Sequence, residues 1–283
     1  MLKILNRRKR NVVFSSILLS ITLTQIAYAQ DDTLYDSREY INNNSIGVQL
    51  KAGVLPGADF DITEGTYHLK SRLQSSFSIG MNYQTNLDHS WGINWGLHIN
   101  LTKRNFFIHI PDSDLNGYLS SQGAPQIEDK DIYLRLVIPF RVIHKFLYND
   151  HGFWDLKAGL NLNYSGFSND EIITASIADT NYQSRNIFYG EFKSNNNKKP
   201  WVTFSLSSSK NLFLKNNNQI SFEIFLELSK TDFLKGNYEI TIPGKPVTRG
   251  TYSVSGSCAG FAIQYTFTGT NKRRVNGYHQ SPF

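Results

Sequence analysis

The chain has 283 residues, of which 40% are hydrophobic, 13% aromatic and 18% charged, with a mean hydropathy of −0.35 and a single cysteine. So many core-forming side chains exclude a disordered chain, and so polar an average excludes a bundle of membrane helices. One cysteine excludes an intramolecular disulfide and a cysteine-based zinc site.

The N-terminus has the pattern of a secretory signal peptide. Five cations lie in the first ten residues, an apolar stretch follows over 12–26, and Ala27-Tyr28-Ala29 precedes Gln30. The alternative is an uncleaved anchor helix, but the apolar run is shorter than the ~20 residues that a spanning helix needs. We therefore expect a signal peptide over 1–29, cleaved near Ala29/Gln30.

Removal of this segment changes the charge balance of the chain. The formal net charge is +6, but the mature chain has 24 basic and 23 acidic side chains once the five N-terminal cations are gone. A chain this close to neutral does not indicate nucleic-acid binding, so we expect no nucleic-acid partner.

After a polar segment over 30–44, expected to be a flexible periplasmic stretch, eight segments alternate apolar and polar residues with period two. They cover 45–55, 71–84, 91–103, 131–145, 153–166, 201–214, 219–230 and 251–268. Short connections alternate with long polar ones, and the long ones span 56–70, 104–130, 167–200 and 231–250. This order predicts an all-β fold, an eight-stranded antiparallel up-and-down barrel over 45–268, followed by a basic C-terminal tail over 269–283.

The size of the side chains predicts which face of the barrel points outward. In 91–101 the odd positions are Trp, Ile or Leu, while the even ones are Gly, Asn or His. The interior of an eight-stranded barrel has room only for modest side chains, so the bulky face must point out. In water that apolar band would be far larger than soluble monomers expose, which predicts a transmembrane barrel.

Aromatic residues gather at the strand ends next to the short turns and the C-terminus. In a transmembrane barrel this position predicts a girdle at the periplasmic interface. The expected periplasmic aromatic girdle consists of Tyr83, Trp91, Trp154, Tyr265 and Phe267.

The charged residues of the strands alternate with the lipid-facing ones, which places them in the lumen. In a narrow interior, four cations and three acids must pair to offset their desolvation. We expect a lumen charge network, structural or gating, made of Lys51, Arg135, Arg141, Asp155, Lys157, Glu223 and Glu227. As a structural plug the network fills the barrel; as a gate, its pairs would switch partners and open an ion path.

Catalysis and metal binding have little support in the sequence. His98 is the one histidine on a lumen face, and no hydroxyl and acid are placed to complete a triad with it. The other histidines lack a spacing suited to a metal, and Cys258 shares a face of small residues, which indicates packing. We expect no enzyme, no catalytic residues, no metal and no cofactor.

Two stretches resemble a known family. The segment 133–140 (YLRLVIPF), the segment 256–267 (GSCAGFAIQYTF) and the strand order look like the PorT-like outer-membrane β-barrel proteins, and the architecture is similar to the OmpA-type membrane domain. The resemblance covers roughly 45–268 and implies an outer-membrane address, with a role in a secretion or surface assembly. Residues 268–283 depart from it, because such barrels often end at the last aromatic residue, so the assembly signal is either Phe267 or Phe283.

The expected function is that of a non-enzymatic barrel with a filled lumen in the outer membrane of a Gram-negative bacterium. It would serve as an anchored structure or bind a protein partner through its surface loops, in contact with outer-membrane lipid and after insertion by the barrel-assembly machinery. The alternative is a small or gated porin for ions or small solutes. Conductance distinguishes the two, because a filled lumen does not conduct.

Overall fold

The computed structural model describes 44–67, 69–88, 90–103, 106–110, 112–114, 118–119, 126–129, 132–149, 152–165, 171–179, 184–194, 199–214 and 218–268. The predicted signal peptide over 1–29, nearly all of the predicted 30–44 segment and the predicted tail over 269–283 lie outside these residues. Among the described residues, no helix has the length and apolar character needed to cross a membrane.

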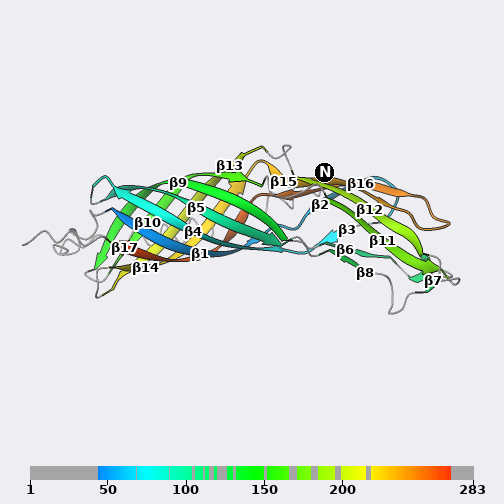
Figure 1. The fold of residues 1–283 in the computed structure, drawn as a ribbon, viewed down its shortest axis with the longest axis horizontal. Helices are drawn as coiled ribbons and strands as arrows, with labels where there is room; N and C mark the ends of the chain where they lie inside the picture. Colours follow the sequence, from blue (N-terminus) through cyan, green and yellow to red (C-terminus); the bar gives the residue numbers. More distant parts are fainter. Residues whose placement is uncertain are drawn as a thin grey trace, which may run out of the picture.

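Eight antiparallel strands close into a barrel, which confirms the predicted fold (Figure 1). Around the barrel the order is β1, β17, β14, β13, β10, β9, β5 and β4, so β17 closes the ring against β1. The strands are β1 (Ser45–Leu55), β4 (Gln74–Asn86), β5 (Trp91–Lys103), β9 (Ile132–Asn149), β10 (Gly152–Tyr164), β13 (Trp201–Phe213), β14 (Gln219–Ser229) and β17 (Cys258–Thr268).

The barrel has its apolar face outside and its polar face inside. On β4, Phe77, Ile79 and Met81 are exposed, while Ser78 between them and Asn82 after them are buried. The same alternation runs along β1, β5, β13 and β14. An exposed apolar band around a polar interior is the arrangement of a membrane-spanning barrel, so the predicted orientation of the two faces is confirmed.

Glycine at position 80 gives a lumen side chain its space. Gly80 lies opposite His98 in the β4–β5 pair, and a Cβ on Gly80 would lie 2.3 Å from the imidazole ring. The imidazole therefore fills the volume that a side chain at position 80 would need. A small residue opposite a large one lets a narrow barrel pack its interior.

The described parts of the long connections contain strands. These strands form a six-stranded sheet and a three-stranded sheet beyond one end of the barrel, on its long axis (Figure 1). The first contains β2 (Asp59–Glu64), β16 (Thr248–Ser255), β15 (Asp232–Ile240), β12 (Ser184–Ser194), β11 (Glu171–Asp179) and β7 (Tyr118–Leu119); the second contains β3 (Leu69–Ser71), β6 (Phe106–His109) and β8 (Gln126–Asp129). We call these two sheets, with the short 3-10 helix η1 (Asp112–Asp114), the distal module.

Three predicted strand boundaries were wrong. The stretch 251–268 is not one strand, because it breaks at residues 256–257 and its first part pairs in the distal module as β16. The stretch 71–84 divides in the same way, since residue 71 ends β3 and β4 begins at Gln74. The fourth barrel strand continues to Asn149 rather than ending at 145. The period-two pattern is the same in both kinds of sheet, so it cannot mark where a strand leaves the barrel.

The distal module has an aromatic core of its own. Phe192 packs edge-on against Tyr252 with ring centroids 4.6 Å apart, and Phe60 lies 5.7 Å from Tyr252 and 6.1 Å from Tyr238. A Cβ at Gly250 would lie 2.4 Å from the Tyr238 ring, so a glycine there admits the tyrosine. Aromatic pairs of this kind bury large apolar areas and stabilise a sheet beyond its hydrogen bonds.

A charge on the lipid face should weaken the barrel in a membrane. We expect Ile79→Arg, near the middle of β4, to lower the free energy of unfolding in lipid vesicles by about 2–4 kcal/mol. Urea titration in vesicles measures it. Thr251→Arg, on an exposed position of the distal module, is the control and should change stability by less than about 0.5 kcal/mol; equal effects of both changes would contradict a lipid-facing Ile79.

Candidate functional site

Glu223 is the centre of the charge cluster inside the barrel. Its carboxylate lies 2.8 Å from the Lys157 ammonium group on β10 and 3.5 Å from the Arg141 guanidinium on β9. The Gln49 amide on β1 also donates to it, at 3.2 Å. The side chains of Glu223, Lys157 and Arg141 are at most 5% exposed. Glu223 therefore joins three walls of the barrel across the lumen.

The other predicted lumen charges lie around this centre. Lys51 on β1 pairs with Glu227 on β14 at 3.2 Å. Asp155 lies 3.6 Å from Lys157 and accepts hydrogen bonds from Ser209 and Asn211. The structure thus brings six of the seven predicted residues into ion pairs.

Arg135 is the exception. It is buried and donates to the Asn100 side chain at 3.1 Å, and its guanidinium carbon lies 5.8 Å from the centre of the Phe233 ring. It makes no ion pair with any residue that the structure describes. The strand pattern predicted that Arg135 faces the lumen but not that it would lie beneath an aromatic ring from the distal module.

Several residues of the lumen network were not predicted from the sequence. Lys145 on β9 is buried and donates to Asn86 at 2.5 Å. It has the same parity as Arg141, so alternation along the strand could have identified it. Amides were missed too: Asn82 donates to Gln49 at 3.1 Å and to Gln264 at 2.8 Å. These neutral groups extend the charge cluster into a continuous polar network.

His98 belongs to this network and faces no nucleophile. Its Nε2 lies 2.8 Å from the Asn82 side-chain oxygen. Within the described part of the chain, no hydroxyl lies within hydrogen-bond distance of the imidazole, and no group of three His, Cys, Asp or Glu side chains could hold a metal. Cys258 is buried in the same region.

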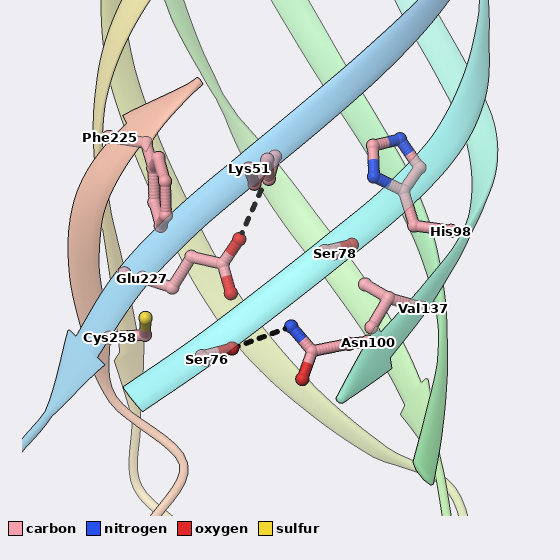
Figure 2. Close-up of a pocket in the computed structure, with 10 residues that line it drawn as sticks. Lys51, Ser76, Ser78, His98, Asn100, Val137, Phe225, Glu227 and Cys258 are labelled. Carbon is pink, nitrogen blue, oxygen red and sulfur yellow. Dashed lines mark hydrogen bonds and ion pairs between the residues drawn. The ribbon is translucent and has the colours of Figure 1, made fainter. Parts of the chain in front are cut away.

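A small cavity lies in the lumen. Figure 2 shows a cavity between β1, β4, β5, β9, β14 and β17, lined by Lys51, His98, Asn100, Phe225, Glu227 and Cys258 among others. The cavity volume is about 10 Å³, which is about enough for one water. This cavity has no room for a solute.

Aromatic side chains are buried at and near the end of the barrel that faces the distal module. Tyr133 on β9, Trp201 on β13 and Phe225 on β14 are buried there. Phe233 on β15 packs edge-on against Tyr133, with ring centroids 6.3 Å apart. All four belong to one buried cluster with the core of the distal module. The barrel and the module therefore share a continuous apolar core.

The five residues of the predicted girdle lie near the opposite end of the barrel. Trp91 stacks on His144 with ring centroids 4.3 Å apart, and Tyr265 packs against Phe267 at 4.9 Å. The Tyr265 hydroxyl accepts a hydrogen bond from Asn218 at 2.7 Å. Tyr83 and Trp154, the other two, are half-buried near the ends of β4 and β10. Trp91 and His144 form a stacked pair from adjacent strands.

A polar clamp joins three connections of the distal module. Asp114 lies 2.7 Å from the Lys245 ammonium group and accepts a hydrogen bond from the Tyr67 hydroxyl at 3.0 Å. Lys245, and after it Tyr67, hold the pKa of Asp114 below its usual value. Burial, together with the bond to Asp114, raises the pKa of Tyr67 to about 12. The Tyr67 hydroxyl therefore stays protonated at neutral pH and remains the donor of its hydrogen bond to Asp114.

This clamp should open in acid. Because folding lowers the pKa of Asp114, its contribution is complete above the unfolded value of about 4 and is lost as the pH falls through the folded value. We expect amide-exchange protection around Lys245, corrected for intrinsic rates, to fall from pH 5 to about pH 2. Asp114→Asn should show weak protection at both pH values; an unchanged pH dependence in that variant would contradict the clamp.

The chain was compared with known proteins. No family model matches it, and no curated protein does either. Among solved structures it is similar to the outer membrane protein OprG from Pseudomonas aeruginosa, at 10% identity and a TM-score of 0.42, over 80% of this chain and 97% of that one. It is also similar to Ail of Yersinia pestis, at 10% identity and a TM-score of 0.30, over 80% and 99%. The barrel assignment rests on the strand pairing of this chain and not on these similarities.

Proposed function

We propose that this chain is an outer-membrane protein whose closed barrel anchors a folded recognition module on the cell surface. The observation that carries the proposal is the apolar core shared by the barrel end and the distal module, with Phe233 packed against Tyr133. A shared core fixes the orientation of the module relative to the membrane. Preorganisation of this kind lowers the entropic cost of binding a partner.

The exposed face of the six-stranded sheet is the proposed recognition surface. On it, Arg249 lies 2.9 Å from Glu239 and 3.4 Å from Glu64, so one cation links three strands. Tyr189 is 46% exposed on the neighbouring β12. Arginine and exposed tyrosine are the residue types enriched at protein interfaces. The proposed partner is another protein of a secretion or surface assembly, in line with the PorT-like resemblance, and no catalytic step is required.

The outer-membrane location, and the side of the membrane on which the distal module lies, can be tested by labelling single cysteines on intact cells with a membrane-impermeant maleimide. We expect Asn237→Cys, exposed in the distal module, to be labelled, and Leu87→Cys, exposed at a short turn, to be labelled only after the outer membrane is permeabilised. The native Cys258 is buried and supplies the background. Labelling in the reverse order, or of neither residue, would contradict the proposal.

The recognition surface has a separate test. A photo-crosslinking residue placed at Thr251 or at Asn237, both exposed on the six-stranded sheet, should give the same protein adduct in living cells. The same residue at Leu97, which is 51% exposed on the lipid face, should not give that adduct. No shared adduct at the two module positions would contradict recognition through this face.

A gated pore is the second candidate, and one observation favours it. On the β10–β13 wall, the side-chain polar atoms of Asn161, Ser205 and Ser207 are buried without a hydrogen-bond partner among the described residues. Such groups favour hydration. A conducting path would also require the Lys51–Glu227 and Lys157–Glu223 pairs to separate. A current through the native protein would favour this candidate over the anchor.

A further inference from the structure

Exposed basic residues gather where the barrel meets the distal module. Lys103 is the last residue of β5, and Lys230 directly follows β14. Arg72 lies two residues before β4, and Lys199 lies two residues before β13. All four are exposed. Lys103, Lys199 and Lys230 make no ion pair within the described part of the chain.

Two of these lysines lie at the ends of lipid-facing rows of side chains. On β5 the row is Leu97, Ile99 and Leu101, which are 51%, 45% and 39% exposed, and Lys103 is the next position outward. On β14, Leu228 is the last residue of the exposed apolar row, and Lys230 lies in the bend after Ser229. One step along such a row is about 7 Å. Both lysines therefore lie where lipid-facing rows end near the distal module.

The basic residues form two patches on opposite sides of the barrel. Ser76 pairs with Thr102, so Lys103 and Arg72 belong to the same pair of adjacent strands, β4 and β5. Thr203 pairs with Ser229, so Lys230 and Lys199 belong to the β13–β14 pair. The β4–β5 pair and the β13–β14 pair are separated by two strands on each side of the ring. We call them the two rim patches.

Two acids follow barrel strands at this end. Asp59 and Asp232 begin strands of the six-stranded sheet, and Asp232 pairs with Lys235 at 3.6 Å. At the other end of the barrel the β5 row ends in Trp91, which stacks on His144, rather than in a cation. On β13, the lipid-facing row that includes Val202 and Phe204 reaches Lys210 at that same end, so cations occur at both ends of the lipid-facing surface.

We propose that the two rim patches bind the phosphate groups of an anionic glycolipid in the outer leaflet. The site requires acyl chains against the apolar rows and a phosphate at the level of Lys103 or Lys230. Lysine binds phosphate as a compact point charge, and arginine binds it through a planar fork. The proposal rests on the proposed membrane orientation, because it needs the distal module to lie outside the cell.

The test is a titration of the refolded protein in neutral detergent with a fluorescent acylated diglucosamine that carries phosphates. We expect Lys103→Gln with Lys230→Gln to weaken binding about 25-fold, since each lysine near an anionic lipid surface contributes about fivefold. The same lipid without its phosphates should bind native protein and variant equally. The matched control is Lys193→Gln with Lys235→Gln, two exposed lysines opposite each other in the distal module, and it should bind like the native protein.

Each outcome of the titration decides the proposal. Equal binding by the rim variant and the native protein would overturn it, as would the same loss in the control pair, which would show an effect of net charge alone. A preference for the dephosphorylated lipid would overturn it too. Folding is measured separately by heat-dependent gel migration: a folded barrel without lipid preference contradicts only the rim patches, whereas a chain that forms no membrane barrel overturns the proposed function and the rim patches together.

Discussion

Glu223→Ala should destabilise the barrel by about 3–5 kcal/mol, because it leaves buried cations without their partner. The change removes the carboxylate that lies 2.8 Å from Lys157 and 3.5 Å from Arg141. Asp155, at 3.6 Å from Lys157, would be the nearest remaining acid for that ammonium group. The measurement is urea unfolding of the refolded barrel, followed by tryptophan fluorescence and by heat-dependent gel migration.

An exposed glutamate supplies the control. Glu191 pairs with Lys193 at 2.6 Å, but the two side chains are 36% and 56% exposed. Exposed pairs contribute about 0–1 kcal/mol, so Glu191→Ala should change stability little. If the two substitutions cost the same, the lumen network would have no special part in holding the barrel together.

Phe233→Ala should separate the distal module from the barrel, with a loss of about 3–5 kcal/mol, the usual range for a buried phenylalanine. Phe233 is 3% exposed and contacts both Tyr133 and Arg135 at the barrel end. Its removal leaves a cavity at the junction and uncovers the Arg135 guanidinium. We expect rapid protease cleavage of the module, while the barrel keeps its heat-dependent migration.

Tyr189→Ala is the matched aromatic control in the same module. Tyr189 is 46% exposed on β12, so its removal should leave proteolysis and stability nearly unchanged. If Phe233→Ala also left the module resistant to protease, the shared core would not be what holds the module in place.

The barrel was predictable because it depends on local alternation. Rows such as Leu97, Ile99 and Leu101 repeat every second residue, and side-chain size alone decided that they point outward. The lumen positions of Lys51, Arg141 and Glu223 followed from the same parity. Which charges pair was not predictable, since the partners of Glu223 come from three other strands whose tilt the sequence does not reveal.

The distal module was not predictable for the same physical reason. Its sheet joins segments far apart in the chain, such as Phe60 opposite Tyr252, and no local pattern specifies which segments pair. Its strands also alternate with the barrel strands along the chain. The alternating pattern of Tyr252 and Val254 therefore continues into that of β17, and nothing in the pattern marks the break at residues 256–257. Short strands within polar connections have too few residues to stand out from loops.

Single-channel conductance of the refolded protein in a planar bilayer tests most directly whether the lumen is blocked. We expect no current from the native protein, because the Glu223 network crosses the lumen and Tyr133, Trp201 and Phe233 are buried at the barrel end. The variant with Glu223→Ala and Glu227→Ala, if folded by gel migration, should at most leak irregularly. A steady native current that changes with this double substitution would contradict a blocked lumen and make the lumen charges a transport path.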